Sequence, residues 1–63
     1  MPMIRVEMFA GRTLEQKRAL AKALTAAFVS TAGSTPASVQ IVFVDVDKSD
    51  WAVAGALCSD PPA

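Results

Sequence analysis

The chain has 63 residues, of which 52% are hydrophobic, and it carries six basic and six acidic side chains, one cysteine and no histidine. One cysteine excludes an internal disulfide, the lack of a Cys/His cluster excludes a zinc site, and the neutral charge argues against nucleic acid as the main partner. We expect a single domain over residues 1–63, with residues 60–63 as a loose tail. A domain of about 60 residues buries only roughly 60% of the surface of its unfolded chain, so we also expect other copies of the chain to stabilise it.

The first predicted element is a strand over residues 3–8, MIRVEM. Apolar Ile4, Val6 and Met8 alternate with Arg5 and Glu7, and this two-residue period is typical of a strand with one apolar face. The two charged residues are expected to form an ion pair. Residues 10–12, Ala-Gly-Arg, predict the turn that ends the strand.

A helix is predicted next, over residues 14–31. Thr13 and Gln16 fit a capping box, in which each side chain accepts a hydrogen bond from the backbone of the other, and Gly33 suits the left-handed position that ends a helix. The side chains expected on the buried stripe are Leu20, Ala23, Leu24, Ala27 and Phe28. Those expected on the solvated face are Glu15, Lys17, Arg18, Lys22 and Thr25.

A second strand is predicted over residues 38–46, SVQIVFVDV, which are rich in β-branched side chains and mostly apolar. This composition predicts a strand that is covered on both faces. Residues 47–50 predict a polar turn, and residues 51–55, which include Trp51, have no clear assignment. Cys58 is expected to be a small apolar filler.

The order strand, helix, strand predicts an α/β fold in which the helix crosses between two parallel strands. One helix covers one face of a two-stranded sheet and leaves the other face bare, although the second strand is apolar on both sides. We therefore expect the fold to be completed by oligomerisation, in which copies pair their sheets and stack.

Nothing in the sequence predicts a membrane or secretory segment. No apolar run approaches the ~20 residues that span a bilayer, and the start of the chain lacks the basic and apolar regions of a signal peptide. The expectation is a soluble, cytoplasmic protein with neither a membrane nor a nucleic acid as its partner.

Several short motifs along the chain resemble those of the 4-oxalocrotonate tautomerase family. The resemblance covers residues 2 to about 57 and rests on Pro2, Gly11-Arg12, Glu15-Gln16-Lys17, Ser38-Val39 and the late aromatic Trp51. It implies small β-α-β subunits assembled as hexamers, and a cofactor-free isomerase acting on a small enol or unsaturated 2-oxo acid.

The resemblance also implies roles for individual residues. Pro2 would be the general base and Arg12 the clamp for a substrate carboxylate, while Phe9, Trp51 and Val53 would line the pocket. The family has a second catalytic arginine where this chain has Gln40. A glutamine donates a hydrogen bond but brings no charge, so a monocarboxylate or ketone-type enol is easier to accommodate than a dicarboxylate.

The chemistry needs a base that is unprotonated near neutral pH. Methionine is commonly removed before a small residue, and loss of Met1 would leave Pro2 with a free secondary amine. An α-amino group has a reference pKa of about 7.7–8.0. Apolar neighbours that exclude water, together with the positive charge of Arg12, are expected to lower the pKa of this amine.

Each of these residues also has a structural interpretation. Pro2 could follow Met1 by chance, Arg12 could be a solvated residue at a helix start, Trp51 could pack in an interface, and Gln40 could be a neutral strand residue. Two other functions stay open: a non-catalytic or complementary subunit of a mixed oligomer, and a hydratase or dehalogenase on the same scaffold.

Overall fold

The computed structural model describes residues 2–61, so the expected removal of Met1 and the end of the expected tail, residues 62–63, lie outside the described residues. The elements in chain order are β1 (Met3–Phe9), α1 (Leu14–Ala32), the 3-10 turn η1 (Pro36–Ser38), β2 (Gln40–Val46), the 3-10 turn η2 (Lys48–Asp50), β3 (Ala52–Val53) and β4 (Ala56–Leu57).

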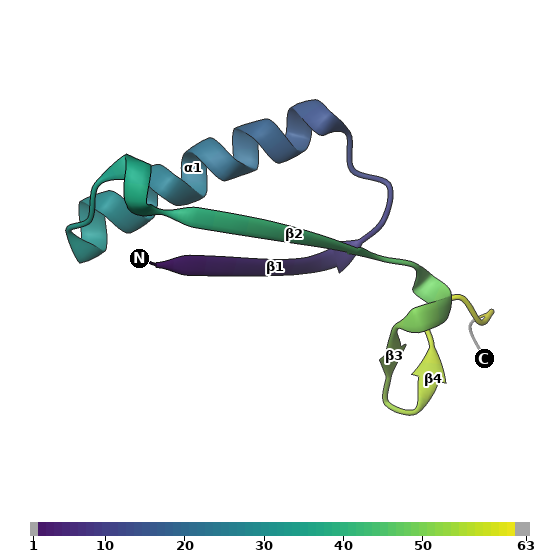
Figure 1. The fold of residues 1–63 in the computed structure, drawn as a ribbon. Helices are drawn as coiled ribbons and strands as arrows, with labels where there is room; N and C mark the ends of the chain where they lie inside the picture. The colour runs from purple at the N-terminus through teal and green to yellow at the C-terminus, as the bar shows by residue number, and fades with distance from the viewer. Residues whose placement is uncertain (1, 62–63) are drawn as a thin grey trace.

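The central unit is a two-stranded parallel sheet with one helix across it. β1 and β2 pair in register from Met3 opposite Gln40 to Phe9 opposite Val46. The helix α1 runs along one face of both strands, and no other element of residues 2–61 lies against the opposite face (Figure 1). The predicted β-α-β fold with parallel strands is confirmed.

Both ends of α1 are fixed by the predicted capping residues. The Thr13 N–H donates to Gln16 Oε1 at 2.9 Å, and the Gln16 N–H donates to Thr13 Oγ1 at 3.1 Å. At the other end Gly33 has φ 73°, a left-handed conformation, and its N–H donates to the Val29 carbonyl. The capping box therefore starts the helix at Leu14 as expected, and the helix ends at Ala32, one residue later than expected.

The predicted buried stripe of the helix is only partly correct. Leu20, Leu24 and Phe28 are half-buried, but Ala23 and Ala27 are exposed, and Thr25 is half-buried although a solvated position was expected. The inner face follows steps of three and four residues, which place position 25 beside positions 21 and 28 and turn positions 23 and 27 outward. Ala23 and Ala27 therefore lie on the exposed face of the helix.

The second strand begins at Gln40 rather than at Ser38. Residues 36–38 form η1, in which the backbone N–H and the Oγ of Ser38 both donate to the Thr35 carbonyl, at 3.0 and 2.8 Å. A serine side chain that bonds nearby backbone offers the chain an alternative to the sheet ladder, and Pro36 fits the first position of such a turn. Local hydrogen bonding thus overrides the β propensity at this position.

The sheet has one covered face and one bare face within the chain. Because paired residues of parallel strands point to the same side, Ile4, Val6 and Met8 share the helix face with Ile41 and Phe43. On the opposite face, Met3 is 58% and Val42 is 42% exposed. Within a single chain β2 is therefore covered on one face only, as expected, and cover of its second face by another copy stays a prediction. Among residues 2–61 only Met8 counts as buried.

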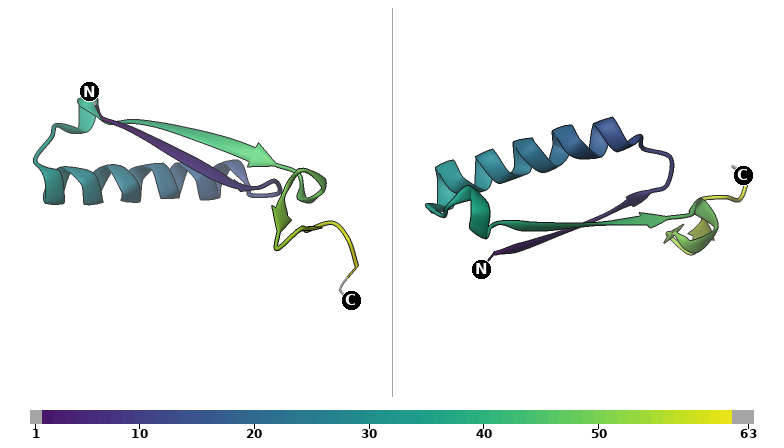
Figure 2. Two further views of the ribbon diagram at one scale, coloured as in Figure 1. Left: turned by 90° about the horizontal axis from the view of Figure 1, so that it is seen from below. Right: turned by 45° about the horizontal axis from the view of Figure 1, so that its top comes forward.

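The last part of the chain forms a small hairpin that was not assigned from the sequence. β3 and β4 pair in antiparallel fashion around Ala54 and Gly55, which have φ values of 54° and 83°. The hairpin extends beyond the end of β2, on the side away from the start of β1, so the chain is long and flat (Figure 2). The principal extents of the chain are 46 × 24 × 15 Å.

Within residues 2–61, no helix has the length and apolar character needed to cross a membrane. The cytoplasmic location stays a prediction.

Candidate active site

Pro2 and Gln40 lie together at one end of the molecule. Since the strands are parallel, β1 and β2 begin side by side, and the Gln40 N–H donates to the Pro2 carbonyl at 3.0 Å. Pro2 is half-buried and Gln40 is exposed. The residue that carries the predicted base is therefore adjacent to the uncharged residue that replaces the expected arginine.

A second group of predicted residues gathers at the opposite end of the strands. The ring of Phe9, the last residue of β1, meets the ring of Trp51 with centroids 4.7 Å apart and planes tilted by 57°. Backbone bonds hold Trp51 on both sides: its N–H donates to the Lys48 carbonyl at 3.4 Å, and its carbonyl accepts from the Cys58 N–H at 2.7 Å. Val53 follows on β3 and is 62% exposed.

Arg12 lies at this same end, in the connection between β1 and α1 (Figure 1). Its side chain is exposed, and no acidic side chain of residues 2–61 forms an ion pair with it. A cation just before a helix start opposes the helix dipole, and a substrate anion would offset that cost. The predicted clamp and the predicted apolar wall therefore lie at the same end of the strands.

One chain does not bring all six predicted residues together. β1 has seven residues, and at about 3.3 Å per residue it separates Pro2 from Phe9 by roughly 20 Å. We call the pair Pro2 and Gln40 the amine end, and the set Phe9, Arg12, Trp51 and Val53 the aromatic end. A substrate small enough to be a simple oxo acid cannot touch both ends of one chain.

Lys48 was not singled out from the sequence, and it belongs to the aromatic end. Its Nζ lies over the Phe9 ring, 5.6 Å from the centroid. A lysine between two aspartates in a polar turn looks like an ordinary solvated residue. What could have drawn attention to it is its place three residues before Trp51, because a short 3-10 turn brings such residues to the same side.

Two ion pairs account for part of the remaining charge. Lys17 of α1 contacts Asp45 of β2 with Nζ 2.6 Å from Oδ2, so Lys17 is half-buried and not on the solvated face where it was expected. The predicted pair of Arg5 and Glu7 is present at 3.6 Å and is exposed. The Lys17–Asp45 pair links the helix to the sheet.

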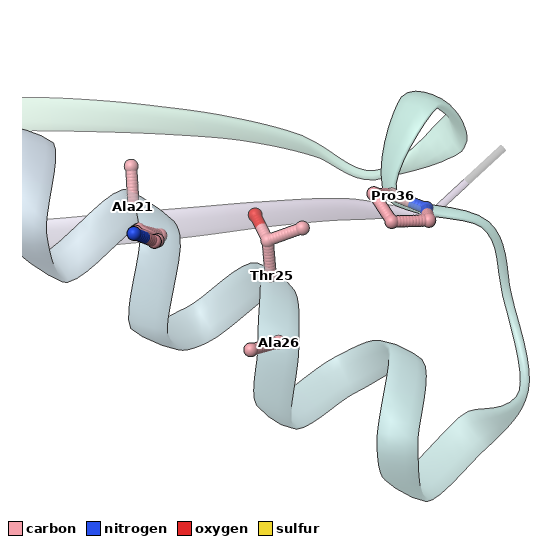
Figure 3. A pocket seen from close by; sticks show the side chains of 5 residues that line it. Ala21, Thr25, Ala26 and Pro36 are labelled. Carbon is pink, nitrogen blue, oxygen red and sulfur yellow. The ribbon is translucent and has the colours of Figure 1, made fainter.

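A groove of about 390 Å³ lies between α1 and η1, toward the end of the molecule where β1 and β2 begin (Figure 3). It is lined by Ala21, Lys22, Thr25, Ala26 and Pro36. None of the predicted site residues lines it. No group of three or more metal-binding side chains is found in the part of the chain that the structure describes.

Comparison with known proteins matches this chain to one family throughout its length. The family model for the tautomerase enzymes matches residues 2–60. The chain belongs to the 4-oxalocrotonate tautomerase family, and thus to the isomerases. A probable tautomerase of Ralstonia nicotianae is 39% identical over 62 residues, which are 98% of this chain and 95% of that protein. The 2-hydroxymuconate tautomerase of Comamonas testosteroni is 38% identical over 55 residues, 87% of each chain.

Solved structures of the tautomerase family share the fold in full. The 4-oxalocrotonate tautomerase homologue YwhB is 36% identical and superposes with a TM-score of 0.92, over 97% of this chain and 100% of that one. A heterohexameric 4-oxalocrotonate tautomerase of Chloroflexus aurantiacus is 33% identical, with a TM-score of 0.90 over 95% and 97% of the two chains. Both ends of the candidate site lie within residues 2–60, which the tautomerase family model matches.

Proposed function

We propose that this tautomerase moves a proton in a small enol or unsaturated 2-oxo acid without a cofactor. The Pro2 amine acts as the general base, Arg12 clamps a substrate carboxylate, and Phe9, Trp51 and Val53 form the apolar wall. The amine takes a proton from the enol and returns a proton at carbon, so it ends the cycle unchanged and no other group is consumed.

The observation that carries the proposal is the division of the site between the two ends of the chain. Roughly 20 Å of strand separates Pro2 from Phe9, so a working site needs the amine end of one protomer beside the aromatic end of another. The bare sheet face, where Met3 is 58% and Val42 is 42% exposed, supports such an association, because exposed apolar patches commonly mark protein–protein interfaces. The proposed assembly is a homohexamer.

The charges at the two ends support the proposed substrate class. Arg12 offers a planar guanidinium that suits one carboxylate, and the aromatic rings at the same end of the strands favour an unsaturated carbon chain. Gln40, next to Pro2, supplies a hydrogen bond without charge. The amine end therefore stabilises a polarised carbonyl less strongly than an arginine at that position would.

A second candidate function is that of a complementary subunit in a mixed oligomer. Two observations favour it: Gln40 stands where the resemblance implies an arginine, and a heterohexameric 4-oxalocrotonate tautomerase is among the similar structures. In that case another chain would supply the missing arginine to a site that this chain shares.

The test of the homo-oligomeric enzyme combines mass spectrometry with one substitution. The purified protein from its native host should lack Met1, and Pro2→Ala should lower kcat/KM for phenylenolpyruvate or 2-hydroxymuconate by about 10² to 10⁴-fold, the usual contribution of a general base. Pro36→Ala, the same change in η1, is the matched control and should keep full activity. A retained Met1, or a Pro2→Ala variant as fast as the parent, would overturn the assignment of the base.

A further inference from the structure

The ammonium of Lys48 occupies a defined place at the aromatic end of the site. Its Nζ is 5.6 Å from the Phe9 ring centroid, and that ring is 4.7 Å from the centroid of Trp51. The backbone adds a second link, since the Trp51 N–H donates to the Lys48 carbonyl at 3.4 Å. One turn, η2, therefore positions both the aromatic wall and a cation on it.

Within residues 2–61, no acidic side chain neutralises the charge of Lys48. Lys17 is paired with Asp45 and Arg5 with Glu7, whereas no carboxylate of residues 2–61 forms an ion pair with Lys48. An aromatic ring attracts a cation through its face but leaves the N–H donors on the other side of the ammonium available. A positive charge with available donors at the edge of an apolar wall is suited to a carboxylate.

We infer that Lys48 is a substrate-binding residue that selects for an additional negative group on the substrate. This inference rests on the proposed function, because it takes the aromatic end as the wall of the site. Arg12 holds one carboxylate and Lys48 meets a second anionic group. Gln40 brings no positive charge to the amine end, and Lys48 at the aromatic end supplies one instead. The site therefore accepts an acid with two negative groups.

The experiment compares two ligands that differ by one carboxylate. The dienes trans,trans-muconate and sorbate both have six carbons, but muconate carries two carboxylates and sorbate carries one. Their binding is measured by equilibrium titration, which does not depend on turnover. Lys48→Met should weaken muconate binding up to about fivefold and sorbate binding less than about twofold, as expected for the loss of one exposed ion pair.

Two further variants separate charge from structure. Lys48→Arg keeps a cation and should bind muconate within about threefold of the parent, whereas Lys22→Met, the same charge removal on the exposed side of α1, should change neither ligand. Added salt should reduce the difference between the parent and Lys48→Met, because it screens an exposed charge. Size-exclusion chromatography of each variant checks that the assembly is intact.

The outcomes distinguish this inference from the proposed function. The role of Lys48 is wrong if Lys48→Met binds muconate as tightly as the parent, if both ligands weaken equally, or if the parent binds muconate no better than sorbate. Any of these results, together with activity that depends on Pro2, would remove Lys48 from the site and leave the tautomerase assignment standing. A Pro2→Ala variant with full activity would instead overturn the base and leave the binding comparison valid.

Discussion

The separation of the amine end from the aromatic end predicts that two inactive variants restore each other. Pro2→Ala removes the proposed base and Arg12→Ala removes the proposed clamp, and each variant alone should be nearly inactive. Because β1 separates these residues by roughly 20 Å, they cannot serve the same site from one chain. A site made by two protomers is intact when one supplies Pro2 and the other supplies Arg12.

The size of the recovery follows from random mixing. When equal amounts of the two variants assemble at random, about a quarter of the shared sites in a symmetric oligomer receive an unaltered Pro2 and an unaltered Arg12. The specific activity of the mixture should then reach about a quarter of the parent value, well above the mean of the two variants. If both residues came from one protomer, no site would be restored.

The assay denatures the two variants together, refolds them and measures turnover of phenylenolpyruvate. Controls are each variant refolded alone, and the two native variants combined without denaturation, which should stay inactive until subunits exchange. Activity that never exceeds the two separate variants, although mass spectrometry detects mixed oligomers, would refute the reasoning that the site is shared between chains.

Three other changes have defined outcomes. Val42→Asp places a charge on the bare sheet face and should shift the protein to a smaller species in analytical ultracentrifugation, whereas an unchanged mass would show that this face is not an interface. Gln40→Arg should raise kcat/KM for 2-hydroxymuconate about tenfold, because it adds a charge-assisted contact, and a fall would mean that the position does not face the substrate. Ala54→Gly should stabilise the hairpin by about 1 kcal/mol in urea denaturation, since alanine is disfavoured at φ 54°; a loss of stability would contradict this.

Local chemistry explains which parts of the fold were predictable. The capping box of Thr13 and Gln16 and the left-handed Gly33 act within a few residues, so the sequence alone places the helix to within one residue. The alternation in residues 3–8 identifies the first strand for the same reason. The helix face was less accurate, because the choice between positions 23 and 25 depends on how the helix sits on the sheet.

Two elements were missed because their sequences lack the usual patterns. A two-residue turn with positive φ at both positions is normally marked by Asn-Gly or Gly-Gly, and Ala54-Gly55 carries only half of that pattern. Ser38 lies in a run of good strand formers, but its side chain bonds the Thr35 carbonyl and keeps it in η1. In both cases the deciding interaction is one that residue preferences do not contain.

The residues of the candidate site could be predicted from the sequence, but their arrangement in space could not. The resemblance to the tautomerases selected Pro2, Arg12 and Trp51, and the strand length was also available from the sequence. What the sequence could not supply is the position of one chain relative to another, which depends on surfaces formed only after folding. Lys48 was missed for a related reason, since its relation to the Phe9 ring appears only in three dimensions.

The division of the chain into two ends also assigns different chemistry to each protomer in the proposed site. The amine end contributes Pro2 and the neutral Gln40, whereas the aromatic end contributes Arg12 and Lys48, the cations that no acidic residue of positions 2–61 neutralises there. In the proposed site the base therefore comes from one chain and the positive charge from its neighbour. On this proposal the Pro2 amine meets a facing cation only when two protomers associate, so assembly is the step that completes the site.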